Sequence, residues 1–153
     1  MVIETESPVE ERVASLLQRL GVSKAHFAGR TAGDWSGLAE SRPEVISSLT
    51  LVCPLGFAPK ILASIAPRLL VFSGDKGAPA EMVSRNLADL PDATMITLPG
   101  YRSPDTYADI AVDRTDGISL GMLEFLNRMG RRDETAPVAL PEGQGDVAGI
   151  SYQ

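Results

Sequence analysis

The sequence predicts an α/β fold, a mostly parallel sheet of about four strands flanked by helices on both faces. Short apolar runs alternate along the chain with segments whose apolar residues recur at helical spacing. The runs are apolar at successive positions, which is typical of parallel strands that are buried on both faces. Strands that alternate with helices in this way build a parallel sheet covered by helices.

The composition is that of a globular chain. Its 153 residues are 44% hydrophobic and 22% charged, which is enough for one domain with a core. The net charge is -6 and no stripe of Lys and Arg interleaved with aromatic residues occurs, so we expect no nucleic-acid partner. No apolar run approaches the roughly 20 residues that cross a bilayer, so we expect no membrane partner. The acidic start lacks the features of a signal peptide, and we expect a cytoplasmic location.

The first predicted element is a helix that begins near Ser7 and ends at Gly21. Ser7 can cap the helix, Pro8 suits its first position, and Glu10 completes a capping box. Gly21 supplies the stop. The residues predicted to be buried at helical spacing are Val9, Val13, Leu16, Leu17 and Leu20.

The rest of the chain continues the alternation. The predicted strands are residues 24–28, 48–53, 69–73 and 93–98, and the predicted helices are residues 32–40, 58–66, 80–90 and 116–129. Residues 74–77 are predicted as a turn, and residues 98–100 as the end of the fourth strand. The buried side of the last helix is predicted to carry Ile118, Met122, Leu123, Phe125 and Leu126. We expect one domain over residues 1–133 and a flexible or partner-pairing tail over residues 134–153, in which residues 147–152 could pair as a strand.

The turn after the first strand reads Gly-Arg-Thr-Ala-Gly over residues 29–33. It has the frame of the G-x-S-x-G turn, in which a serine nucleophile sits between a strand and a helix. Glycines at the first and last positions suit a close approach of strand and helix. Thr31 stands at the serine position, where a β-branched residue suits a positive φ poorly.

The order of these segments resembles the C-terminal half of the α/β-hydrolase superfamily over roughly residues 8–129. The similar stretches are residues 26–33, 42–54, 69–77 and 97–104. The resemblance places Thr31 at the nucleophile position, Gly77 at the position of the acid, and Tyr101 and Arg102 where the histidine is expected. Asp75 lies beside the acid position as a possible substitute acid.

Other residues add alternatives at the same sheet edge. Tyr101 and Arg102 are candidate ligand-binding residues for an anion, with loop packing as the other interpretation. His26, the chain's only histidine, is expected to be structural rather than a base, and Cys53, the only cysteine, to be an inert buried thiol. No metal-ligand spacing and no nucleotide motif occurs, so we expect no cofactor.

With all three triad positions changed, the resemblance implies a catalytically degenerate domain that acts as a binding, structural or regulatory partner. The alternative is a hydrolase or acyltransferase of small esters or thioesters, which would use Thr31 or residues supplied by a partner. In the family the strand before the turn has neighbours on both sides, whereas here its outer edge should be bare. We therefore expect a homo-oligomer, a companion chain or the tail strand to cover that edge.

Overall fold

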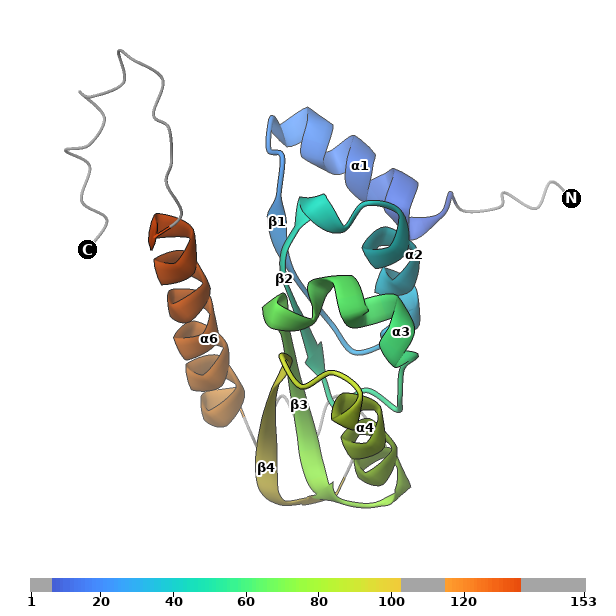
Figure 1. Ribbon diagram of the computed structural model, residues 1–153, viewed down its shortest axis with the longest axis vertical. Helices are drawn as coiled ribbons and strands as arrows, with labels where there is room; N and C mark the ends of the chain where they lie inside the picture. The colour runs from blue at the N-terminus through green and yellow to red at the C-terminus, as the bar shows by residue number, and fades with distance from the viewer. Residues whose placement is uncertain (1–6, 103–114, 136–153) are drawn as a thin grey trace, which may run out of the picture.

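A four-stranded parallel sheet organises the computed structural model, which describes residues 7–102 and 115–135 (Figure 1). Its strands lie in the order β1-β2-β3-β4. They are β1 (Ala25–Gly29), β2 (Ile46–Val52), β3 (Leu69–Lys76) and β4 (Thr94–Arg102). The predicted fold class is confirmed, and β1 lies at the edge of the sheet.

Helices cover both faces of the sheet. One face is covered by α1 (Val9–Leu20), α2 (Gly33–Ser41), α3 (Pro59–Leu62) with the 3-10 helix η2 (Ala63–Arg68), and α4 (Ala78–Ala88). A short 3-10 helix, η1 (Pro43–Val45), leads into β2. In the described part of the chain, α6 (Thr115–Thr135) alone covers the opposite face (Figure 1). Residues 136–153 lie outside the described residues, so the predicted tail stays a prediction.

The hydrophobic core is split by the sheet into two clusters. Because successive side chains of a strand point to opposite faces, Leu51 and Val71 join the cluster beneath the four-helix face. Phe72 joins the second cluster, where Phe125 and Met129 of α6 pack against the sheet. The central strands β2 and β3 therefore supply side chains to both clusters.

The start of α1 differs from the prediction, while its end agrees with it. Pro8 is the N-cap residue and no side chain caps the helix, so the predicted capping box of Ser7 and Glu10 is wrong. The backbone of Gly21 is left-handed with φ 66°, as the predicted stop requires. Of the predicted apolar stripe Leu17 is buried, whereas Leu16 and Leu20 are 53% and 64% exposed.

Strands β3 and β4 are both longer than predicted. Residues 74–76 continue β3 instead of turning, and β4 passes through Pro99 and Gly100 to Arg102. Lys76 pairs with Arg102 across an irregularity in the ladder. Among the described strands β4 is an edge strand, and proline is tolerated at an edge because outward N–H groups are not needed by a neighbour.

The last helix begins one residue before its predicted start, continues six residues beyond its predicted end, and buries most of the predicted residues. Phe125 is fully buried and Ile118, Met122 and Leu126 are half-buried, as predicted. Leu123 is 57% exposed, because its position on the helix points away from the sheet.

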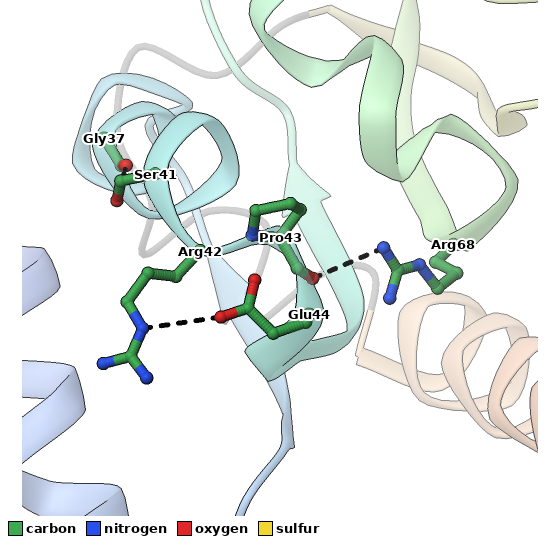
Figure 2. Close-up of polar contacts among 6 residues, drawn as sticks. All are labelled: Gly37, Ser41, Arg42, Pro43, Glu44 and Arg68. Atoms are coloured by element: carbon green, nitrogen blue, oxygen red, sulfur yellow. Dashed lines mark hydrogen bonds and ion pairs between the residues drawn. The ribbon is translucent and has the colours of Figure 1, made fainter.

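Polar contacts hold the connection between α2 and β2 at the amino ends of the strands (Figure 2). The Arg68 guanidinium donates a 2.6 Å hydrogen bond to the Ile46 carbonyl and a 3.4 Å bond to the Pro43 carbonyl. Arg42 and Glu44 form an exposed ion pair at 3.5 Å, which contributes little to stability. The Arg68 bonds therefore fix the start of β2 more firmly than the ion pair does.

Candidate functional site

The carboxyl ends of the four strands lie along one edge of the sheet, which is where parallel sheets usually bind ligands. Thr31 follows β1, Cys53 follows β2, Asp75 lies near the end of β3, and residues 101–102 end β4. The predicted site residues therefore share this edge. They are spread along it, because each belongs to a different strand.

Close packing requires only one of the two glycines in the turn between β1 and α2. A Cβ atom at Gly29 would lie 2.5 Å from Nε1 of Trp35, so only glycine fits beneath that indole. Trp35 also packs against Phe27, with ring centroids 5.1 Å apart. Gly33 has no atom within 4 Å of a built Cβ, so the expectation that close packing requires glycine there is wrong.

Thr31 lies at the exposed tip of this turn with an ordinary backbone. In the described part of the chain, Cys53 is the non-glycine residue with a positive φ, so the φ of Thr31 is negative. The strained turn that presents a nucleophile above the sheet is therefore not formed at Thr31. Helix α2 begins two residues later, with Ala32 as its N-cap residue.

Asp75, the candidate substitute acid, points toward β4 and away from the strand that leads to Thr31. Its Oδ2 accepts a 2.8 Å hydrogen bond from the Gly100 backbone N–H in β4. Strand β2 lies between β1 and β3, so the strands that carry Thr31 and Asp75 are about 10 Å apart. The carboxylate links β3 to β4 at the point where their register shifts.

Tyr101 and Arg102 lie at the other end of the same edge. Three strand spacings, about 14 Å, separate β4 from β1. Tyr101 is half-buried against the second core cluster, and the exposed Arg102 side chain passes over Gly77. Gly77 has φ 94° and is the N-cap residue of α4, a backbone that an aspartate at the acid position would adopt with strain.

His26 forms a contact that the sequence did not indicate. Its Nδ1 lies 2.7 Å from Oγ of Ser48, the residue opposite it on β2. His26 is exposed, whereas Ser48 is completely buried. The pair has the composition of a nucleophile and its base, but the hydroxyl is out of reach of a substrate. The two residues are 22 positions apart, so only the strand register reveals the pair.

The backbone of Cys53 is the second feature that the sequence did not indicate. Its φ is 47°, and its backbone N–H donates a 2.9 Å hydrogen bond to the Phe72 carbonyl. Burial raises the pKa of the thiol, and a hydrogen bond from the Gly74 backbone and the charge of Arg30 oppose this shift. A buried, protonated thiol agrees with the expected inert role.

A cavity of about 470 Å³ adjoins the carboxyl ends of β3 and β4 beside α4. Asp75 lines it, while Thr31, Tyr101 and Arg102 do not. Its lining is Ser73, Gly74, Asp75, Ala80, Glu81, Ser84, Arg85, Met95 and Thr97. The structure thus brings none of the other predicted site residues to this cavity.

The described segments hold neither a candidate metal site nor a membrane-crossing helix. Residues 7–102 and 115–135 contain no group of three or more His, Cys, Asp or Glu side chains that could hold a metal ion. None of the helices in these segments combines the length and the apolar character that crossing a bilayer requires.

The fold is similar to that of solved hydrolases. No protein family and no curated protein matches the sequence. A predicted CIB-like hydrolase from Thermoplasma acidophilum matches with a TM-score of 0.64 at 14% identity, over 78% of this chain and 58% of its own length. A hydrolase from Pseudomonas aeruginosa PA01 matches with a TM-score of 0.57 at 16% identity, over 82% of this chain and 74% of its own. This chain, which spans 58% of the first of these structures, has an α/β-hydrolase-like fold over the matched part.

Proposed function

We propose that this chain is a catalytically degenerate α/β-hydrolase-like domain that acts through binding, as a structural or regulatory partner. The observation that carries the proposal is the backbone of Thr31. The residue occupies the nucleophile position but has a negative φ, so the turn lacks the strain that lifts a hydroxyl above the sheet.

The positions of the remaining groups support the same proposal. Acyl transfer needs a nucleophile, a base within hydrogen-bond reach and donors aimed at the oxyanion. The only histidine, His26, lies within β1 and contacts Ser48. Asp75 is bonded to the backbone of β4, and the acid position is Gly77. His26 and Asp75 are thus each bonded to a neighbouring strand of the sheet.

The open edge of β1 is the surface at which this domain would bind. The N–H and C=O groups along the outer edge of a strand pair readily with another strand. Among the described residues no strand lies beyond β1, and its His26 and Ala28 side chains are exposed on the α6 side. A homo-oligomer or a companion chain that supplies a strand would bury this edge.

An ester assay tests the loss of chemistry. The purified chain would be incubated with short-chain p-nitrophenyl esters beside two variants, Thr31→Ala and Thr115→Ala. Thr115 is an exposed threonine at the start of α6, outside the lining of the cavity, and serves as the matched control. We expect all three proteins to give the background rate of hydrolysis. Turnover that Thr31→Ala abolishes and Thr115→Ala retains would contradict the proposal and support a hydrolase or acyltransferase that uses Thr31.

A further inference from the structure

Helix α1, which precedes β1, exposes two leucines. In α1, Leu17 points into the first core cluster. Successive helical residues are turned by about 100°, so Gln18 lies on one flank of Leu17 while Leu16 and Leu20 lie on the other. The Gln18 flank faces Val45, which leads into β2. The exposed Leu16 and Leu20 therefore lie on the flank of α1 that faces away from the start of β2.

The path of α6 brings the chain back toward this edge. After β4, α6 runs along the opposite face of the sheet, antiparallel to the strands, and packs on β2 and β3 (Figure 1). Its first turns lie over the end of β4, where Gly117 approaches Leu98. The chain thus leaves α6 near the amino ends of the central strands, having moved from β4 in the direction of β1.

The handedness of the crossover connections restricts where a strand after α6 would lie. The connections from β1 to β4 all pass over the face that carries α2, α3 and α4, and such crossovers are right-handed. A connection through α6 would cross the opposite face and run back across the sheet, from β4 toward β1. These two reversals together leave the crossover right-handed. A parallel strand that follows α6 and lies beside β1 therefore completes a right-handed crossover.

We propose that residues 147–152, Val-Ala-Gly-Ile-Ser-Tyr, add to the outer edge of β1 as a fifth, parallel strand. They lie outside the described residues, and their sequence alternates apolar Ala148, Ile150 and Tyr152 with small Gly149 and Ser151. The eleven residues 136–146 can span up to about 36 Å. The distance from β2 to a strand beyond β1 is about 10 Å, so this linker is long enough.

Charge favours this segment over a second copy of β1. An antiparallel pair of β1 strands centred on Phe27 would set Lys24 of one copy opposite Arg30 of the other, and like charges that face each other are destabilising. In the parallel arrangement, Asp146 enters the sheet at the Lys24 end of β1. The opposite charges of Asp146 and Lys24 then support the pairing.

The consequence is that residues 147–152 would regulate binding at the edge of β1. This inference rests on the proposed function, since it takes the edge of β1 as the binding surface. A partner strand would have to displace residues 147–152 before it could pair with β1. The free chain would then be a monomer whose edge is protected by its own C-terminal segment.

Hydrogen exchange in the full-length chain tests the pairing. Ile150→Asp places a charge in the proposed strand, and Val138→Asp makes the same change in the linker as the matched control. We expect amide exchange in β1 to accelerate about tenfold or more in Ile150→Asp and to stay unchanged in Val138→Asp. Unchanged exchange in the amides of β3 verifies that both variants are folded.

Two results would overturn the pairing. One is exchange in β1 that is equally fast in all three proteins, which means that the segment does not protect the edge. The other is protection that rises with protein concentration together with a dimer mass in light scattering, which means that the edge pairs between copies. Neither result bears on the ester assay, and ester turnover through Thr31 would leave the pairing itself intact.

Discussion

At the residue scale, the strained backbone of this sheet edge is at Cys53 and not at Thr31. Both follow a strand at its carboxyl end, yet only Cys53 has a positive φ. The sequence argues against this, because Pro54 disfavours helical backbone conformations at the preceding residue and favours extended ones. The hydrogen bond from the Cys53 N–H to the Phe72 carbonyl holds the residue in place. Such a tertiary contact cannot be read from the sequence.

The buried thiol of Cys53 should make stability depend on alkaline pH. Burial raises its pKa, so the folded chain retains the proton where the unfolded chain has lost it. Stability is therefore unaffected by this group below the unfolded pKa of about 8.5 and falls as the pH rises above it. We expect urea denaturation to show this fall in the wild type and a smaller one in Cys53→Ala. Equal falls in both proteins would contradict the assignment.

Restoring the missing acid should cost stability. We expect Gly77→Asp to lower the free energy of unfolding by about 1–3 kcal/mol, because φ 94° is a backbone that favours glycine. Gly33→Ala is the control, since Gly33 has no positive φ and no close neighbour, and its expected effect lies between zero and a gain of about 1 kcal/mol. Chemical denaturation measures both. Equal stability of Gly77→Asp and wild type would show that the backbone can still accept an acid.

At the element scale, the kinds of helices and strands could be predicted but several of their ends could not. The apolar runs locate all four strands, because burial on both faces leaves a local pattern in the sequence. Residues 74–76 look like a turn by composition, yet they extend β3 because they pair with β4. The candidate site was likewise predicted only in part. Its residues lie at the carboxyl edge of the sheet, as predicted, whereas the Asp75–Gly100 and His26–Ser48 contacts could not be predicted because they depend on the strand register.

The close packing of α6 on the sheet should depend on one glycine. A Cβ atom at Gly121 would lie 2.8 Å from Cδ1 of Ile96 and 2.9 Å from the ring of Phe72, which is fully buried and cannot move aside. We expect Gly121→Ala to lower the free energy of unfolding by about 1–3 kcal/mol. At Gly117 the added Cβ would be 3.9 Å from Leu98, so Gly117→Ala should be neutral or gain up to about 1 kcal/mol of helix propensity.

Denaturation of the two glycine variants side by side separates packing from propensity. Both changes are made in the same helix, one turn apart, and both replace glycine by alanine. If Gly121→Ala were as stable as Gly117→Ala, α6 would not be packed as closely on β3 and β4 as the structure has it.

At the scale of the whole molecule, the two core clusters share their strands. Leu51 and Val71 face one cluster, while Val52 and Phe72 face the other, on the same two central strands. The sequence predicted burial on both faces from the continuous apolar runs of these strands. It could not predict that one face depends on a single helix over the described residues, because that follows from the path of the chain after β4.

The shared strands should make the two clusters unfold together. Phe125→Ala removes a fully buried ring from the α6 cluster and should lower the free energy of unfolding by about 3–5 kcal/mol. Trp35, the only tryptophan, packs against the other cluster, so its fluorescence reports the far face of the sheet, while far-ultraviolet circular dichroism reports the helices. Because loss of α6 uncovers β2 and β3, both signals should shift to the same lower urea midpoint. A variant in which the dichroism shifts while the Trp35 transition stays in place would mean that the helices on the two faces are stabilised independently.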